Sequence, residues 1–198
     1  VYGESIKTDR IELLGSTSFG DHWRLEYSFS DHHQDSYYGA TQYVADQRTG
    51  FCQLIRNQTV GNHDILAGLS ARYEYYDDNS PVSAEDRDLI PGVFVQDHWS
   101  FASGWSLVSG GRLDWHDDHG LIFSPRLNMK YELDEWTRFR LNAGTGFRQV
   151  HLFTEDHSAL SGSREVEILE DLQPEQSFQV GLNVNHVYQA GDFGVGTI

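Results

Sequence analysis

The residues best suited to bind a metal ion or a polar ligand form a short run, His116-Asp117-Asp118-His119. Imidazole and carboxylate groups are suitable ligands for transition metals. A tight loop, however, points neighbouring side chains in different directions, so that few of them reach one point. The run therefore favours a solvated turn over a metal site, and its four residues are kept as candidates for contact with a substrate.

A second group of candidates lies in the longest predicted loop, within residues 151–157. His151, Glu155, Asp156 and His157 offer the same ligand chemistry and could contact haem or a metal chelate. An ordinary polar loop is the simpler interpretation. Both groups depend on the elements that hold them in place.

No catalytic motif accompanies these candidates. The sequence lacks a Gly-x-Ser-x-Gly turn, a His-Glu-x-x-His helix and a phosphate-binding Gly-Lys-Ser/Thr loop. Cys52 is the single cysteine, so it can form neither an internal disulfide nor a cysteine metal site. We predict that the chain is not an enzyme and requires no cofactor.

The elements that carry the candidates show a repeat of two residues. In 121–133, Phe123, Leu127 and Met129 alternate with charged and polar residues such as Arg126. Such segments contain about a dozen residues, which is longer than the five or six residues that are usual for strands of soluble proteins. The predicted strands cover residues 5–19, 22–33, 46–59, 63–77, 89–101, 104–116, 121–133, 136–148, 174–188 and 191–198.

The predicted connections alternate in length. Tight turns are expected at Gly20-Asp21, Gly61-Asn62, Ser103-Gly104, Asp134-Glu135 and Gly191-Asp192. Long loops are expected at 34–45, 78–88 and 149–173, with a shorter one at 117–120. Tight turns at one end and long loops at the other are typical of outer-membrane barrels, whose periplasmic turns are short and whose extracellular loops are extended.

Aromatic residues predict two bands at the membrane boundaries, where rings with one apolar and one polar end are favoured. The band beside the tight turns contains Phe19, Trp23, Trp99, Phe101, Trp105 and Trp136. The band toward the long loops contains Tyr37, Tyr38, Tyr43, Tyr75, Tyr76 and Trp115. Asp97 is an exception, because it falls in register with apolar neighbours. Either a position at the interface or a bulge would explain it.

Basic side chains are concentrated on the polar face of the later strands. The group contains Arg126, Lys130, Arg138, Arg140 and Arg148. Guanidinium groups on a face that lines an enclosed interior pair with carboxylates or bind an anionic substrate. Neutralisation of these basic side chains by Glu132 and other acids of the barrel is a simpler explanation than direct contact with a ligand.

Composition excludes several other classes of protein. The net charge of −16 argues against a nucleic-acid partner, because phosphate binding requires clustered Lys and Arg. No run approaches the roughly 18 apolar residues that a membrane helix needs. The chain opens at Val1 with no targeting segment, so we expect its natural start to lie upstream.

Five motifs in order resemble the barrel of TonB-dependent outer-membrane receptors. They are Gly92-Val93-Phe94-Val95-Gln96-Asp97-His98-Trp99, Gly110-Gly111-Arg112-Leu113-Asp114, Phe123-Ser124-Pro125-Arg126, Gly144-Thr145-Gly146-Phe147-Arg148 and Leu172-Gln173-Pro174-Glu175-Gln176-Ser177. The resemblance covers about 90–188 through these motifs and the first ninety residues through the barrel pattern.

The resemblance implies an all-β antiparallel transmembrane barrel of about 22 strands whose interior holds a plug domain. Residues 1–198 would be part of that barrel, with the plug absent from this chain. It implies an outer-membrane receptor that imports a scarce nutrient, such as an iron-siderophore, haem or cobalamin, in contact with outer-membrane lipid. The energy-coupling partner would be the TonB complex, acting through the missing N-terminal part. Two alternatives stay open at this point: a passive porin-like barrel, and a soluble β-sandwich that binds carbohydrate or metal.

Overall fold

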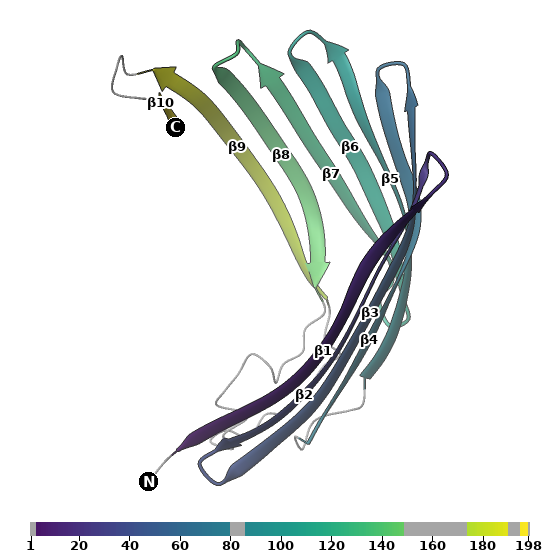
Figure 1. Cartoon of the computed structure of the whole chain (residues 1–198), viewed down its shortest axis with the longest axis vertical. Helices are drawn as coiled ribbons and strands as arrows, with labels where there is room; N and C mark the ends of the chain where they lie inside the picture. Colours follow the sequence, from purple (N-terminus) through teal and green to yellow (C-terminus); the bar gives the residue numbers. More distant parts are fainter. Residues whose placement is uncertain (1–2, 80–85, 149–173, 190–194, 198) are drawn as a thin grey trace.

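The computed structural model describes residues 3–79, 86–148, 174–189 and 195–197 as one antiparallel β-sheet (Figure 1). Ten strands lie side by side in the order in which they follow one another along the chain. They are β1 (Glu4–Phe19), β2 (Trp23–Tyr38), β3 (Thr41–Val60), β4 (His63–Asp78), β5 (Asp86–Ala102), β6 (Trp105–His116), β7 (Gly120–Glu132), β8 (Thr137–Arg148), β9 (Glu175–Gln189) and β10 (Val195–Thr197). Nine of the predicted strands are confirmed, and the described residues Val195–Thr197 of the tenth, 191–198, also form a strand.

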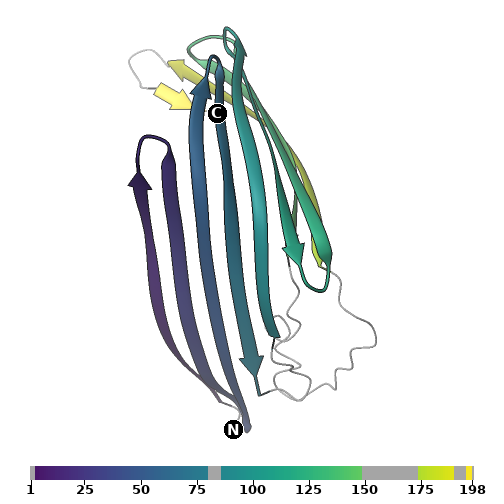
Figure 2. The same ribbon diagram turned by 90° about the vertical axis from the view of Figure 1, so that its right-hand side faces the viewer.

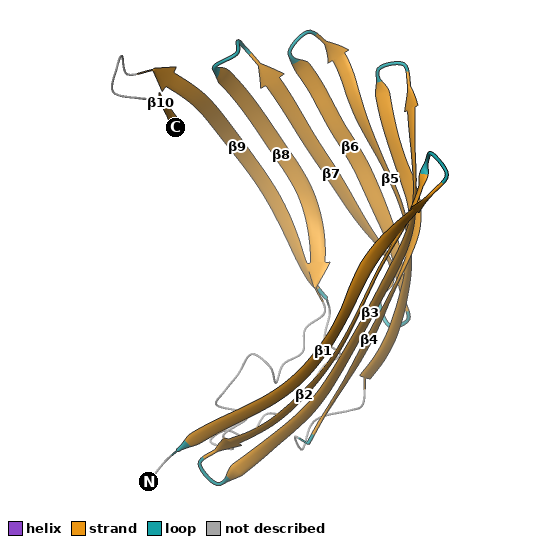
Figure 3. Cartoon of the chain, viewed as in Figure 1, coloured by secondary structure: helices purple, strands orange, loops and turns teal. Residues whose placement is uncertain are grey.

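The sheet is a single curved layer with β1 and β10 at its two edges (Figures 1 and 2). All regular structure in the described residues is strand (Figure 3), and no helix there is long and apolar enough to cross a membrane. No second sheet covers either face of the strands that the structure describes. The soluble β-sandwich is therefore wrong, because its core requires an opposing sheet.

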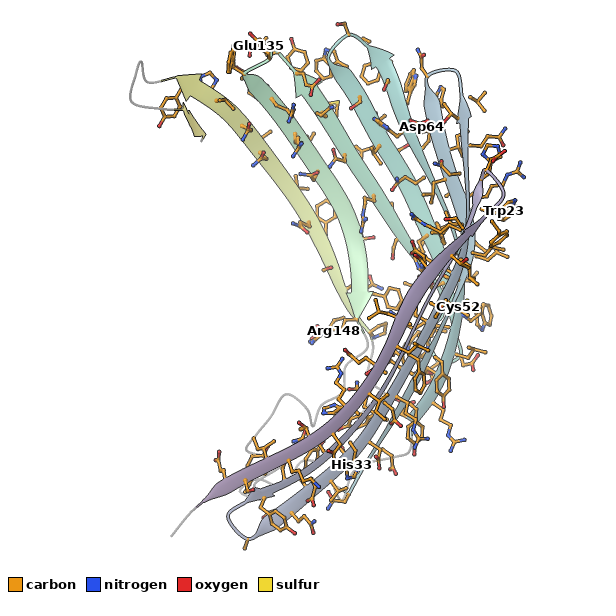
Figure 4. All side chains as sticks on the ribbon, viewed as in Figure 1. Trp23, His33, Cys52, Asp64, Glu135 and Arg148 are labelled. Atoms are coloured by element: carbon orange, nitrogen blue, oxygen red, sulfur yellow. The ribbon has the colours of Figure 1, made fainter. Side chains whose placement is uncertain are left out.

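The two faces of the sheet differ in chemistry. Because side chains alternate across a strand, each register row belongs to one face. Trp23 and Cys52 lie on the convex side (Figure 4), and the large apolar residues that share their face are exposed, as Leu69 (60%) and Phe123 (63%) illustrate. The opposite face carries the polar row Gln53, Ser70, Gly92 and Asp114. Apolar side chains thus cover the outside of the curve and polar ones the inside.

The predicted tight turns lie between strands where expected, except that Gly191-Asp192 and the long loop 149–173 fall outside the described residues. One predicted long loop is wrong. Residues 34–45 are not a loop, because β2 continues to Tyr38 and β3 begins at Thr41. Gly39, with a φ of 65°, allows the tight turn between them. Polar residues on both faces of this segment predict a loop. A strand that continues beyond the membrane into water can be polar on both faces, so polarity does not end it there.

The aromatic band at the tight-turn end is continuous across the four strands β5 to β8. Ring centroids of Trp99 and Phe101 are 5.0 Å apart, those of Phe101 and Trp105 6.1 Å, and those of Trp105 and Tyr131 4.2 Å. Tyr131 in turn stacks on Phe139 at 6.3 Å. These contacts confirm the band at this end.

The band at the other end is only half confirmed. Tyr37, Tyr75 and Trp115 share the convex face. Tyr38, Tyr43 and Tyr76 instead lie on the concave face, where Tyr38 and Tyr43 are buried. Residue type alone did not separate these groups, because the side of a tyrosine depends on the register of its strand.

Asp97 keeps its regular register on the convex face, opposite Ile65 and Ser109. Nδ1 of His63 donates to Oδ2 of Asp97 at 2.8 Å. The pairing of β5 with β6 becomes irregular only between Trp99 and Ala102, closer to the turn. Asp97 therefore has a polar partner near the tight-turn end, and the bulge lies beyond it.

Candidate functional site

The concave face of β4, β5 and β6 carries a buried ion pair. Arg112 donates from Nε to both carboxylate oxygens of Asp114, at 2.9 and 2.8 Å, and from Nη2 to Oγ of Ser70 at 2.9 Å. Asp114 is 1% exposed. Gly92 lies opposite, and a Cβ at this position would collide with Oδ1 of Asp114. The glycine thus makes room for the pair, whose charges are satisfied within the sheet.

Cations line the concave face of β7 and β8. Glu132 accepts from Lys130 at 3.3 Å and from Arg138 at 2.9 Å. Arg148 pairs with Glu175 on β9 at 2.9 Å. These contacts confirm that charge balance within the wall accounts for three of the five basic residues singled out from the sequence.

Arg126 and Arg140 are the remaining two. Both are exposed on the concave side, and neither forms an ion pair or hydrogen bond with any residue in the part of the chain that the structure describes. Arg140 lies opposite Lys130, a like charge, and Arg126 lies opposite Gly144, which offers no side chain. Two guanidinium groups are thus directed at whatever occupies the inside of the curve.

The inner wall is hollowed where glycines replace larger side chains. One hollow is lined by Arg126, Asn128, Asn142, Gly144, Gly146, Ser177 and Gln179. A second is lined by Arg24, Gln53, Ile55, Phe94, Gln96, Gly110, Arg112, Ser124 and Arg126, among others. Arg126 borders both hollows. The two hollows adjoin at Arg126 on the inner side of β2 to β9, and together they are called the trough.

At the end opposite the tight turns, tyrosines form a hydrogen-bonded group. The hydroxyl groups of Tyr43 and Tyr76 lie 2.6 Å apart, and the hydroxyl of Tyr76 donates to Oδ2 of Asp78 at 2.9 Å. Asn79 fixes the neighbouring backbone, because its side-chain oxygen accepts from the N–H of Val44 at 2.9 Å. This group gives the long strands β3 and β4 a rigid inner surface beyond the trough.

The run 116–119 is not a uniformly solvated turn. His116 is 1% exposed and lies on the concave face, whereas Asp117 and Asp118 are exposed. The ring of His119 stacks on that of His116 at 4.5 Å between centroids. Nε2 of His116 is 3.5 Å from Oδ2 of Asp88 on β5, which is also buried. His151, Glu155, Asp156 and His157 lie outside the described residues.

Sequence analysis missed Asp88 because of the register of β5 and β6. At the turn, Ala102 of β5 pairs with Trp105 of β6. Farther along the strands, Trp99 pairs with Leu107, which is a register shifted by one residue. A one-residue slip moves a side chain to the other face. Without this irregularity Asp88 and His116 would lie on opposite sides of the sheet, so no local pattern could have joined them.

A pKa shift marks the tight turn between β7 and β8. The backbone N–H groups of Trp136 and Thr137 donate to Oδ1 of Asp134 at 2.8 and 2.6 Å. The hydrogen bond from Trp136 contributes most to holding the pKa of Asp134 below its ordinary value of 3.8. This carboxylate shapes the turn and lies at the end opposite the candidate site.

Comparison with known proteins agrees with the geometry. The family model described as "TonB dependent receptor-like, beta-barrel" matches residues 4–197. The iron-regulated outer membrane virulence protein of Vibrio cholerae serotype O1 is 30% identical over 138 residues, which cover 67% of this chain and 21% of that protein. The chain thus spans about a fifth of the length of this curated relative.

Solved structures share the fold. The siderophore receptor PirA from Pseudomonas aeruginosa superposes with a TM-score of 0.69 at 16% identity, covering 94% of this chain and 37% of the receptor. A mutant of the ferric enterobactin receptor PfeA from the same organism gives 0.68 at 14% identity, covering 97% of this chain and 33% of the receptor. At these identities the likeness concerns the fold alone.

Proposed function

Since this chain belongs to the TonB-dependent receptor family, as part of its β-barrel, we propose that the whole protein imports an iron chelate across the outer membrane. The chain is an outer-membrane protein, and its family comprises receptors and transporters, not enzymes. A plug domain and the rest of the barrel would be supplied by sequence outside residues 1–198. The TonB complex would provide the energy through the N-terminal part.

The observation that carries the proposal is the pair of unpartnered guanidinium groups on the inner wall. The chain has 30 acidic and 14 basic residues, yet Arg126 and Arg140 face the interior without a carboxylate partner among the described residues. A cation that faces away from the available acids favours an anionic partner from elsewhere. We assign that partner to carboxylates of the plug domain, which the trough would hold.

The choice of iron rests on the relatives. One is named for its regulation by iron, and two structural neighbours are named as receptors for a siderophore and for ferric enterobactin. Lipid contact is supported by the exposed apolar convex face. The site residues His116, Asp117, Asp118 and His119 would lie at the extracellular end, where a chelate arrives.

Uptake of radioactive iron by cells that produce the full-length protein tests this function. The strain should lack its own iron receptors and be offered ferric complexes of a catecholate and of a hydroxamate, with radioiron-labelled haem as a third source. We expect accumulation of at least one, and its loss when TonB is deleted. Accumulation that persists without TonB would indicate a passive porin-like barrel, and failure of all three probes would overturn the assignment to iron.

A further inference from the structure

Three potential ligands converge where β5, β6 and the turn after β6 meet. One ligand atom each from Asp88, His116 and Asp118 lies within 4.8 Å of the others. Asp88 and His116 come from neighbouring strands and their side chains are 6% and 1% exposed, whereas Asp118 is exposed in the turn. The group combines one imidazole with two carboxylates, and it is separate from the cations of the trough.

From this cluster we propose that the protein binds one divalent transition-metal ion, with zinc as the best match, at the extracellular end of its inner wall. Zinc bonds to histidine nitrogen and carboxylate oxygen measure about 2.0–2.2 Å, so two ligands of a tetrahedral ion lie about 3.3–3.6 Å apart. Nε2 of His116 and Oδ2 of Asp88 are 3.5 Å apart. That spacing fits two ligands of one ion better than a hydrogen bond, which is shorter.

The surroundings hold the two buried ligands in place. The ring of His119 stacks on His116 with an interplanar angle of 29°, which restricts rotation of the imidazole. The slipped register of β5 and β6 fixes Asp88 on the same face as His116. Pre-oriented ligands bind a metal more tightly, because less conformational freedom is lost when the ion enters.

The third ligand completes the site by a small movement of the turn. The backbone N–H of Asp118 donates to Nδ1 of His116 at 3.2 Å, so a neutral ring carries its proton on Nε2. Coordination through Nε2 moves this proton to Nδ1 and ends that long hydrogen bond. Asp118 is then free to bring its carboxylate toward the ion, with water as the fourth ligand.

The ion would connect two strands and a turn that differ in sequence position by up to thirty residues. The trough, by contrast, is lined by arginines, of which Arg112 is paired with Asp114 and Arg126 has no partner among the described residues. The site therefore does not depend on the proposed import of iron, and a protein that transports no iron could still contain it.

Zinc titration of the purified full-length protein in detergent tests the proposal. Isothermal calorimetry with zinc chloride should show one saturable ion per chain, and calcium should bind more weakly, because imidazole favours transition metals over calcium. D118N should lower the affinity for zinc at least about tenfold, since even outer partners of a metal ligand contribute that much. D117N is the matched control, as a neighbouring exposed carboxylate outside the cluster, and should bind as the parent protein does.

A second variant separates the loss of a ligand from the loss of the folded state. H116Q keeps a polar side chain of similar size, and its folded state is checked by the heat-dependent gel mobility of barrels. We expect folded H116Q to lose saturable zinc binding. Equal zinc affinity in folded H116Q and the parent, equal losses in D117N and D118N, or absence of saturable zinc binding by the parent would each overturn the proposal.

Discussion

Strands β2 to β6 and strands β8 and β9 differ in what covers their concave side. On β2 to β6, this side carries buried residues such as Ser36, Ser70 and Asp114, and the charges there are paired within the sheet. On β8 and the described part of β9, no residue is buried, and Arg140 has no partner among the described residues. The first region thus has buried and paired side chains on its inner surface, whereas the second has exposed ones, among them an arginine that pairs with no described residue.

Strand length changes between β5 and β6, within the first of these regions, and β9 with 15 residues is intermediate. Strands β1 to β5 contain 16 to 20 residues, whereas β6 to β8 contain 12 or 13. A tilted strand needs about 9–11 residues to cross a bilayer. The longer strands therefore continue into the extracellular space, where the tyrosine group around Tyr76 lines their inner side. Strands β2 to β5 thus extend the wall beyond the membrane, whereas β8 presents the unpaired charge of Arg140 to the interior.

The largest expected effect comes from removing the buried carboxylate of the packed region. D114A leaves the guanidinium group of Arg112 with only Ser70, and should lower the free energy of unfolding of the full-length protein by about 2 kcal/mol, less than for a fully buried pair because Arg112 is partly exposed. Urea unfolding in detergent micelles measures this change in the free energy of unfolding. E175A, which removes an exposed partner of Arg148 on β9, is the control and should cost less than about 1 kcal/mol. Equal costs would contradict the division.

Glycines offer a matched test of the same difference. G92V introduces a side chain against Asp114, and the overpacking should destabilise the protein by about 1–2 kcal/mol. Gly181 lies on the concave face of β9, where an added Cβ meets nothing within 4 Å. G181V should therefore be tolerated. Thermal unfolding of both variants provides the comparison, and a G181V protein as unstable as G92V would show that β9 is as tightly packed as β5.

The charge of the open region is tested by removing its two unpartnered guanidinium groups together. R126Q/R140Q should loosen the proposed plug, because each lost charged hydrogen bond is worth about 1.5 kcal/mol, or roughly tenfold in the population of the opened state. Influx of an antibiotic too large for porins, measured as growth inhibition, should rise. R148Q serves as the control, since Glu175 already pairs with this arginine. Unchanged influx in the double variant would remove the argument that a plug contacts this wall.

The smallest effect is expected at the turn between β7 and β8, where the second region begins. The pKa of Asp134 is lowered in the folded state, so its carboxylate stabilises the fold above the ordinary value of 3.8, and this contribution is lost as the pH falls through the lower folded value. D134N should abolish that part of the acid dependence. The free energies of unfolding of D134N and of the parent protein, each measured at neutral pH and below about pH 4, test this expectation. An identical acid dependence in D134N would assign it to other carboxylates.

Much of the fold was predictable because alternation is a local property. The apolar row of 121–133 and the tight turns at Gly20 and Gly61 need only neighbouring residues to be recognised. The strand β3 was predicted too short, since polar residues beyond the membrane resemble a loop. Such segments are identified only when a partner strand is seen to continue beside them.

The candidate site was harder to predict because it depends on register between distant residues. His116 was recognised by its residue type, but its burial and its partner Asp88 follow from the slip between Trp99 and Ala102. Alternation within one strand predicts its two faces, but it does not show which residue of the neighbouring strand pairs with a given residue. Arg126 and Arg140 were placed on the inner face correctly, whereas their lack of partners appeared only in three dimensions.

The central claim is that the convex face touches hydrocarbon and the concave face lines a water-filled interior. Single cysteines at Leu127, Asn128, Gln179 and Val180, introduced into the full-length protein with Cys52 replaced by serine, test it directly in intact outer membranes. We expect a bilayer-soluble maleimide to label L127C and V180C, and a water-soluble maleimide to label N128C and Q179C. Labelling of all four positions by the water-soluble reagent would contradict the account.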